Sequence, residues 1–269
     1  MNIVALVKQV PGTDNVKMNP ETGTMVRTGK DNVINPLDEN ALTEALRIKQ
    51  QTTGTTVTAV SMGPQTAEKA LKEAIALGAD EGILLSSRAF AGADTIATAR
   101  VLAAAVKKLE NVSMILCGER ATDGETGQTG PMVAAMLGIP VVTFVKEINV
   151  GENTAIVIRI VENGYEKVEI PYPFMATVVK DINEPGFPTL SGKVQARETL
   201  VKVWSEEELG LPKNELGLTG SPTRVVKIFS PKLARDTRIL KHDGSGNAVG
   251  ILVKLLQEKK RNCIKGCGK

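Results

Sequence analysis

The sequence predicts an α/β fold, doubly wound around a mostly parallel sheet, with antiparallel additions and an extended C-terminal arm. Apolar segments alternate with amphipathic helical segments over roughly the first 145 residues. The apolar segments are short and rich in aliphatic and β-branched residues, as is typical of strands buried on both faces. Beyond residue 146 the alternation stops, and β-rich segments and then proline-punctuated loops follow. We therefore expect a Rossmann-like or flavodoxin-like domain followed by less regular chain.

The first elements have clear local signals. The run IVALVKQ at 3–9 predicts a buried strand, and residues 11–34, rich in Gly, Asn, Asp and Thr, predict a long loop or a hairpin. A helix then follows from NPLDENALTEALRIKQQ. Asn35 is its candidate N-cap, and Pro36 suits the first helical position. Acidic residues in the first turn also favour a helix start here.

Three more strand and helix pairs continue the pattern. Strands are predicted from TTVTAVSMG at 55–63, GILLSS at 82–87 and SMILCG at 113–118. The helix PQTAEKALKEAIALG should stop at Gly78, and the helix DTIATARVLAAAVKKLE should be capped by Asp94. A further helix is expected around residues 131–137, and IPVVTFVKEINV predicts a fifth strand.

The second half of the chain is less regular. The segments NTAIVIRIV, YEKVEI and FMATVVK are β-rich, and we expect them to extend the sheet as antiparallel edge strands. From Asp181 onward the sequence is loop-like, with a weak helix predicted from AVGILVKLLQEKK. We therefore expect an α/β domain at 1–180, and at 181–269 a less regular part of the chain that wraps over a neighbouring surface.

Composition excludes several classes of function. No apolar run reaches the roughly 18–20 residues that span a bilayer, and the N-terminus lacks a signal peptide's basic region. Three cysteines do not make a disulfide framework, so we expect a cytoplasmic protein. The chain has one histidine, His242, which argues against a histidine base, a Ser-His-Asp triad or a His-rich metal site. Scarce aromatics argue against a stacking platform for single-stranded nucleic acid.

Charge is concentrated at the C-terminus. Residues 224–269 hold 12 Lys and Arg against 3 Asp and Glu, a local net charge of +9, which leaves −6 on the rest of the chain. This pattern is compatible with a solvated basic tail, with a docking arm for a more acidic partner, or with nucleic-acid binding. Nucleic acid is the least favoured, because no known nucleic-acid motif accompanies the charge.

Common phosphate and metal motifs are missing. The sequence has no Walker A motif and no GxGxxG after its first strand, which disfavours a standard P-loop NTPase or an N-terminal dinucleotide fingerprint. Near the C-terminus, Cys263 and Cys267 stand four residues apart without a second pair. A metal site would need more ligands, so a frayed tail is the favoured interpretation.

Three loops nevertheless point to a nucleotide site. VSMGPQTA, SSRAFAGADTIAT and CGERATDGETGQTG each follow a predicted parallel strand and lead into a helix, so they should line one edge of the sheet. Helix N-termini offer free N–H groups to phosphate, and threonines add hydroxyl donors. The three glycines of the third loop would remove side chains where a ligand approaches the backbone.

Two acids in the third loop do not suit a phosphate. Asp123 and Glu125 could accept hydrogen bonds from ribose hydroxyls or an adenine amino group, could hold a basic residue, or could point into solvent. The residues leave these alternatives open. The loop suits a nucleotide whose sugar and base matter as much as its phosphates.

Several segments resemble the β subunit of electron transfer flavoproteins. They occur in order over residues 3–197, and the most family-specific surrounds CGERATDGETGQTG. The others are VKQVPGT, NPLDENALTEALRIK, TAVSMGP, ALGADEGILLS and NEPGFPTLSGKVQAR. The resemblance implies an adenine nucleotide α-hydrolase-like version of the Rossmann-like fold. It also implies a heterodimer with an α subunit whose FAD shuttles electrons to a partner dehydrogenase, of acyl-CoA or 2-hydroxy-acid type.

The resemblance also implies which residues hold a nucleotide and which recognise a partner. In ordinary members the β subunit holds a structural AMP, whereas in electron-bifurcating members that site holds a second FAD. The implied contacts are Leu6, Asn35, Pro36, Leu37, Asp38, Ser61, Met62, Gly118, Arg120, Ala121, Asp123, Gly124, Glu125, Thr126, Gly127, Gln128 and Thr129. The resemblance makes residues 1–180 the nucleotide-binding α/β domain and residues 181–269 a recognition loop and a C-terminal arm that packs on the α subunit. Leu190 corresponds to the leucine that anchors the recognition loop in the dehydrogenase.

Two segments favour FAD over AMP. AFAGADTIATARVL and DGETGQTG both resemble the bifurcating branch, and a pyrophosphate could then lie across two helix N-termini. Asp94, Thr95 and Thr98 would meet the ligand from one side, and Thr126 to Thr129 from the other. The resemblance then implies that the flavin takes hydride from NADH and that electrons pass to ferredoxin and to the α-subunit FAD. A universal-stress-type nucleotide-binding regulatory domain is a second alternative.

No protein acid or base is required for such electron transfer, because the flavin carries the redox chemistry. We therefore expect no catalytic side chain and no metal. Arg88 or Arg120 could stabilise a reduced, anionic flavin, and a surface salt bridge is an equally good interpretation of each arginine.

Overall fold

A computed structural model describes residues 1–12, 32–226, 239–240 and 247–266, the last nine of these by backbone alone. The chain divides into two compact units, Met1–Ile228 and Phe229–Lys269, and each is described by itself. Residues 13–31 of the predicted loop, His242 and Cys267 lie outside the described residues.

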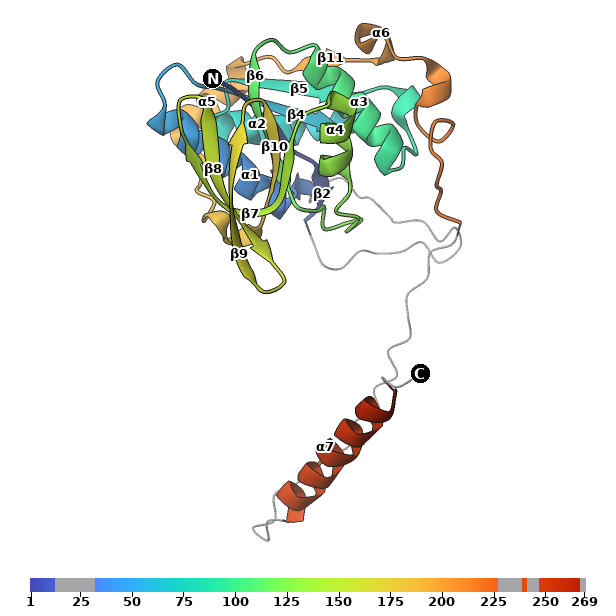
Figure 1. The fold of residues 1–269 in the computed structure, drawn as a ribbon. Helices are drawn as coiled ribbons and strands as arrows, with labels where there is room; N and C mark the ends of the chain where they lie inside the picture. Colours follow the sequence, from blue (N-terminus) through green and yellow to red (C-terminus); the bar gives the residue numbers. More distant parts are fainter. Residues whose placement is uncertain (13–31, 227–238, 241–246, 267–269) are drawn as a thin grey trace. The chain divides into compact units, whose positions relative to one another are not determined.

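The first unit is built on one sheet of nine described strands (Figure 1). In chain order these strands are β1 Asn2–Leu6, β4 Thr56–Met62, β5 Glu81–Leu85, β6 Val112–Gly118, β7 Val141–Val150, β8 Thr154–Val161, β9 Gly164–Pro171, β10 Phe174–Val178 and β11 Lys202–Trp204. In space they are ordered β11-β5-β4-β1-β6-β10-β7-β8-β9. Every pair from β11 to β7 is parallel, and β7, β8 and β9 pair antiparallel. The predicted doubly wound, mostly parallel α/β fold is confirmed.

Helices cover both faces of the sheet. The α-helices of this unit are α1 Pro36–Gln51, α2 Glu68–Leu77, α3 Thr95–Lys107, α4 Thr129–Leu137, α5 Leu190–Glu198 and α6 Glu206–Leu209. Short 3-10 turns are η1 Gln65–Ala67, η2 Arg88–Phe90, η3 Lys180–Ile182 and η4 Lys213–Glu215. Side chains alternate along β1, so Ile3 packs in the core beneath α1 and α2 while Val4 packs in the core beneath α3 and α4.

The strand order creates a switch point next to β1. After β1 the chain builds β4 and β5 on one side, and then returns to place β6 on the other side. The loops at the carboxyl ends of β1 and β6 therefore part in opposite directions. In open α/β sheets such a crevice is where ligands bind.

The expectation that FMATVVK forms an antiparallel edge strand is wrong. β10 lies inside the sheet, parallel to β6 on one side and to β7 on the other. All five of its residues are buried, because both faces of an interior parallel strand are covered. The hairpin β8–β9 carries the chain out from β7 and back. The other two β-rich segments do form the predicted antiparallel extension at the edge.

Helix-end signals were largely correct. Gly78 ends α2 with φ +131°, and the Asp94 side chain caps α3. Asn35 occupies the N-cap position of α1, but its side chain makes no capping hydrogen bond because it is used elsewhere. The ends of the predicted long loop pair as two short antiparallel strands, β2 Gln9–Pro11 and β3 Asn32–Ile34.

Chain beyond residue 180 is more ordered than its sequence suggests. α5 packs against α2, and β11 adds a parallel edge strand beside β5. The second unit contains α7 Asn247–Gly266, which extends the predicted terminal helix at both ends. Within the described part of the chain, no helix combines the length and the apolar character needed to cross a bilayer. Packing of residues 181–269 on a partner subunit stays a prediction.

Candidate functional site

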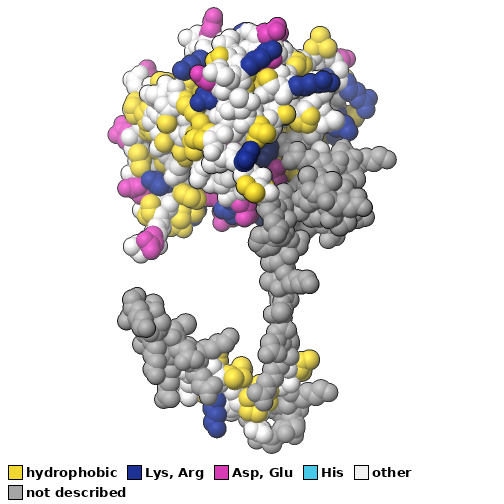
Figure 2. Space-filling view, turned by 90° about the vertical axis from the view of Figure 1, so that its right-hand side faces the viewer, with side chains coloured by type: hydrophobic (Ala, Val, Ile, Leu, Met, Phe, Trp, Pro, Cys, Tyr) yellow, Lys and Arg dark blue, Asp and Glu magenta, His cyan; other side chains and the backbone are white. Residues whose placement is uncertain are grey.

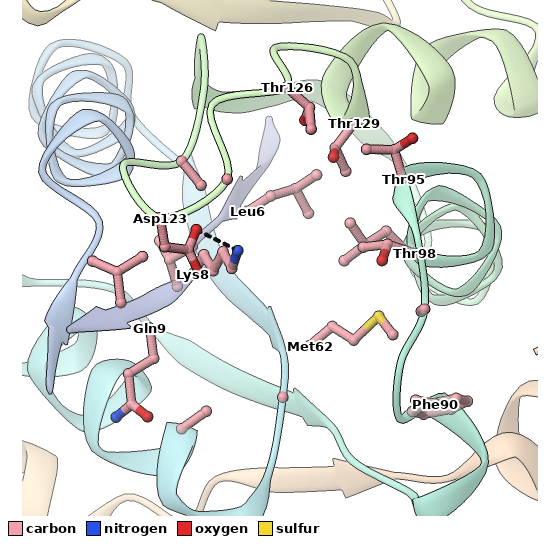
Figure 3. Close-up of a pocket in the computed structure, with 18 of the residues that line it drawn as sticks. Leu6, Lys8, Gln9, Met62, Phe90, Thr95, Thr98, Asp123, Thr126 and Thr129 are labelled. Carbon is pink, nitrogen blue, oxygen red and sulfur yellow. Dashed lines mark hydrogen bonds and ion pairs between the residues drawn. The ribbon is translucent and has the colours of Figure 1, made fainter. Parts of the chain in front are cut away.

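A cavity of ≈ 1510 Å³ opens at the carboxyl edge of the sheet (Figure 3). The loops that follow β1, β4, β5 and β6 line it, together with residues 223–225. Leu6 and Met62 point into the cavity, with Thr95 and Thr98 from α3 opposite the Lys8 side. The predicted loops therefore meet at one place, as parallel strand ends require.

Most of the predicted nucleotide contacts line this cavity. They are Leu6, Asp38, Met62, Asp94, Thr95, Thr98, Gly118, Arg120, Ala121, Asp123, Gly124, Glu125, Thr126, Gly127, Gln128 and Thr129. The remaining four, Asn35, Pro36, Leu37 and Ser61, do not line it. Whether the lining residues hold a nucleotide stays a prediction.

Asp38 joins the two strand ends at the switch point. Its carboxylate accepts hydrogen bonds from the Lys8 N–H at 2.8 Å, just after β1, and from the Gly118 N–H at 2.9 Å, at the end of β6. Burial raises the pKa of Asp38 from 3.8 to about 6, and the hydrogen bonds from Gly118 and Lys8 lower it in part. Both carboxylate oxygens are used in holding the crevice together.

The side chain of Asn35 holds the loop after β6 in place. Its amide donates to the Arg120 carbonyl at 3.0 Å and its carbonyl oxygen accepts from the Thr122 N–H at 3.1 Å. Nearby, a Cβ on Gly118 would meet the Cβ of Leu37 at 2.6 Å, so α1 packs directly on the end of β6. Contact with a nucleotide is not needed to explain Asn35 and Leu37, because both support the loop that lines the cavity.

Asp123 pairs with a lysine. Its Oδ1 lies 2.7 Å from Lys8 Nζ, and the pair links the start of the chain to the loop after β6 (Figure 3). Of the alternatives that the sequence left open, the structure shows a basic partner for Asp123. Glu125 is exposed and has φ +50°, which places it in a turn of the same loop.

The starts of α3 and α4 face each other with different free groups. Asp94 Oδ1 accepts from the N–H groups of Ile96 and Ala97, both at 3.0 Å, so the first turn of α3 is already capped. At the start of α4, Gln128 makes no side-chain cap. The Thr95 hydroxyl donates to Gln128 Oε1 at 3.4 Å across the gap. The free N–H groups for an anion therefore lie at α4.

Hydrogen bonds lower the pKa of Asp94. Partial burial alone would raise this pKa, but the bonds from Ala97, Thr223 and Ile96 outweigh it. The carboxylate that the resemblance assigned to a ligand is thus occupied by protein donors.

Three glycines between the end of β6 and the first turn of α4, Gly124, Gly127 and Gly130, have different structural roles. Gly127 has φ +63°, which favours glycine whatever binds nearby. A Cβ on Gly130 would meet Thr177 Cγ2 at 2.7 Å, so this glycine allows α4 to pack on β10. A Cβ on Gly124 would meet nothing within 4 Å. Gly124 is therefore the one of the three whose missing side chain the protein's own packing does not explain.

Sequence reasoning missed part of the lining. Lys8 belongs to the predicted strand at 3–9, and residues 224–225 begin the basic segment at 224–269, yet these residues and Thr223 line the cavity. Arg120, a candidate for flavin contact, forms an ion pair with Glu119 at 2.6 Å, and Arg88 lines the cavity without an ion pair among the described residues. No local signal could have placed residues 223–225, because their position depends on contacts with residues about 130 positions earlier.

A separate exposed surface lies at the start of α5. Leu190 is 83% exposed and Phe187 is 95% exposed. The Thr189 hydroxyl caps the helix by accepting the Gly192 N–H at 3.0 Å, which holds the turn in place. Leu190 is not part of the cavity lining, so it could serve a partner without touching a ligand there.

Comparison with known proteins agrees with this geometry. The model of the electron transfer flavoprotein domain matches residues 22–209. The chain is 43% identical over 259 residues to the caffeyl-CoA reductase-Etf complex subunit CarD of Acetobacterium woodii, covering 96% of this chain and 99% of that one. It is 46% identical over 236 residues to the electron transfer flavoprotein subunit beta of Thermoanaerobacterium thermosaccharolyticum, covering 87% and 90%. It is also 41% identical over 239 residues to the acryloyl-CoA reductase electron transfer subunit gamma of Anaerotignum propionicum, covering 86% and 89%.

The family match covers well over half of the chain, and the relatives align with it almost from end to end. Both findings agree with a Rossmann-like sheet whose carboxyl edge carries a large cavity. The chain belongs to the electron transfer flavoprotein family, as a subunit of the β type.

Proposed function

We propose that the chain is the β subunit of a heterodimeric electron transfer flavoprotein and that its cavity binds FAD. The size of the cavity carries this proposal. Its ≈ 1510 Å³ exceeds the roughly 300–1,000 Å³ of a pocket for a drug-sized ligand, which leaves room for a dinucleotide. An AMP would occupy only part of it, and structural AMP is the alternative that we keep.

The lining suits the parts of a dinucleotide. The uncapped start of α4 offers the N–H groups of Thr129 and Gly130 to phosphate, and Thr95 and Thr98 lie across from it in the first turn of α3 (Figure 3). Leu6 and Met62 supply an apolar floor on which a ring system can pack. Asn35 and Asp38 would hold the loops in position rather than touch the ligand.

The proposed cofactor supplies the redox chemistry. When bound, FAD would supply the redox chemistry that links NADH as hydride donor to ferredoxin and, through the α-subunit FAD, to a partner dehydrogenase. The protein's own task is then to bind, orient and shield. Arg88 lines the cavity as a positive charge without an ion pair among the described residues, so it is a candidate for stabilising an anionic reduced flavin.

Names of relatives support the proposed partners. The relatives of Acetobacterium woodii and Anaerotignum propionicum are subunits that work with caffeyl-CoA and acryloyl-CoA reductases. We therefore propose a dehydrogenase acting on CoA thioesters as the preferred partner, with a 2-hydroxy-acid dehydrogenase as the other class. Leu190 would anchor the contact, and the basic arm would hold the α subunit.

Counting flavins tests the proposal directly. The αβ dimer is purified and its flavin is measured by absorbance per dimer, and any released nucleotide is identified by chromatography. We expect close to two flavins per dimer. One flavin together with one recoverable AMP would show that the cavity holds the structural nucleotide and would refute the bifurcating assignment. Because the chain belongs to the electron transfer flavoprotein family, no observation favours the alternative of a universal-stress-type regulatory domain.

A further inference from the structure

Residues 216–223 pack against η2 and the start of α3. Leu216 is buried in the core beneath α3, and the Leu218 N–H donates to the Ala91 carbonyl at 3.0 Å. Gly217 has φ +52°, and a Cβ there would lie 2.3 Å from the Ala89 carbonyl oxygen. Only glycine allows the chain to approach η2 this closely. The path of the segment is therefore set before it reaches the cavity.

Asp94 then locks the segment at the start of α3. Its second carboxylate oxygen, Oδ2, accepts from both the Thr223 N–H at 3.0 Å and the Thr223 hydroxyl at 2.8 Å. Its own N–H donates to Ser221 Oγ at 2.8 Å, and Ser221 in turn donates to the Gly217 carbonyl at 2.6 Å. Bonds to a charged acceptor are stronger than neutral ones. Asp94 thus caps α3 and holds Thr223 with its side chain, and holds Ser221 with its backbone N–H; we call this set of contacts the Asp94 latch.

The Asp94 latch places a positive charge at the rim of the cavity. Thr223, Arg224 and Val225 line the cavity directly after the latched residues. Two other cations of the lining are neutralised within the protein, since Lys8 pairs with Asp123 and Arg120 pairs with Glu119. Arg224 makes no ion pair with any residue that the structure describes. It is therefore available to an anionic ligand.

We propose that Arg224 is an anion-binding residue of the cavity, that it contacts the phosphate of a bound dinucleotide, and that Ser221 and Thr223 position it through the Asp94 latch. The inference rests on the proposed nucleotide site. A guanidinium suits phosphate because it can donate two parallel hydrogen bonds to it. The phosphate could belong to the resident nucleotide or to the nicotinamide dinucleotide donor, and the two sources are separable by experiment.

The test uses the purified αβ complex and five proteins. Wild type is compared with Arg224→Gln, Arg224→Lys, Thr223→Val and Thr219→Val. Thr219 is an exposed threonine of the same segment whose side chain makes no hydrogen bond within the described chain, so Thr219→Val is the matched control for Thr223→Val. Dissociation of the second flavin is measured by titrating free FAD and counting flavin per dimer. Binding of NAD⁺, which does not reduce the flavin, is measured by calorimetry on the fully loaded complex.

Arg224→Gln should raise the Kd of one of these two ligands about tenfold, and Arg224→Lys should recover most of the loss. A loss for FAD assigns Arg224 to the resident nucleotide, and a loss for NAD⁺ assigns it to the donor. Thr223→Val should weaken the same ligand by about threefold and should speed amide exchange at residues 221–224, whereas Thr219→Val should change neither. If Arg224→Gln leaves both affinities within twofold of wild type, the proposal is overturned.

The outcome is separable from that of the proposed function. If the wild-type complex carries AMP in place of a second flavin, the assignment of FAD fails, and the same titration with AMP still tests Arg224. Equal losses in Thr223→Val and Thr219→Val would show that the segment matters only for folding, and would overturn the Asp94 latch as a positioning device.

Discussion

Asp38 gives the protein a pH-dependent stability that one substitution should remove. The side chain is 6% exposed and accepts two backbone N–H groups across the switch point. Burial raises its pKa from 3.8 to about 6. Because the folded pKa lies above the unfolded one, the folded state binds the proton more tightly. The stabilising contribution of protonation is therefore fully present below pH 3.8 and is lost as the pH rises through 6.

The size of the effect follows from the shift. Between pH 5 and pH 7 the contribution of Asp38 to the free energy of unfolding should fall by about 1 kcal/mol. Asp38→Asn cannot titrate, so the difference in stability between wild type and variant should change by that amount over the same range. Asparagine also replaces one acceptor by an amide group that faces a buried N–H, which costs about 1–3 kcal/mol at either pH.

Urea unfolding at pH 5, 6 and 7, followed by the fluorescence of the single tryptophan, Trp204, measures both effects. Asn40→Ser is the matched control, because Asn40 is a buried amide of the same helix that bonds to Asn183 and not to Asp38, so its cost should be the same at each pH. If the free energy of unfolding changes equally with pH in wild type and Asp38→Asn from pH 5 to pH 7, the pKa of Asp38 is not raised in the folded protein and the reasoning is refuted.

Three further predictions concern the cavity and the partner surfaces. Leu190→Ala should weaken electron transfer to the dehydrogenase and leave flavin content intact. Because Leu190 is 83% exposed, the free energy of unfolding should change by less than about 0.5 kcal/mol. Loss of flavin would show that Leu190 serves the cofactor site and not partner recognition. Gly124→Ala should keep the thermal stability of wild type and lower nucleotide affinity. Gly130→Ala should destabilise the fold by about 1–3 kcal/mol, because its Cβ would lie 2.7 Å from Thr177 Cγ2. A larger loss of stability for Gly124→Ala than for Gly130→Ala in calorimetry would contradict our interpretation of these glycines. Deleting residues 229–269, the second compact unit, should weaken pairing with the α subunit on size exclusion, and an unchanged affinity of the dimer would refute a docking role for the arm.

Much of the fold could be predicted because its signals are local. Alternating strand and helix segments, Gly78 at the end of α2 and Asp94 at the start of α3 each reflect properties of a few neighbouring residues. The wrong expectation for FMATVVK has the same basis. A short, mostly apolar run is compatible with both an edge and the interior of a sheet, and the interior position of β10 is decided by its pairing with β6 and β7.

The site divides in the same way. The sequence by itself determined that three strand-to-helix loops would meet at one edge of a parallel sheet, and that glycines and threonines would gather there. Only the tertiary structure decided which groups are free to act. The carboxylates of Asp38, Asp94 and Asp123 resembled candidate ligand contacts, yet each is occupied by a protein partner that is distant in sequence. The physical reason is that hydrogen bonds and ion pairs between remote segments depend on how the chain packs, and no local pattern of residues records that packing.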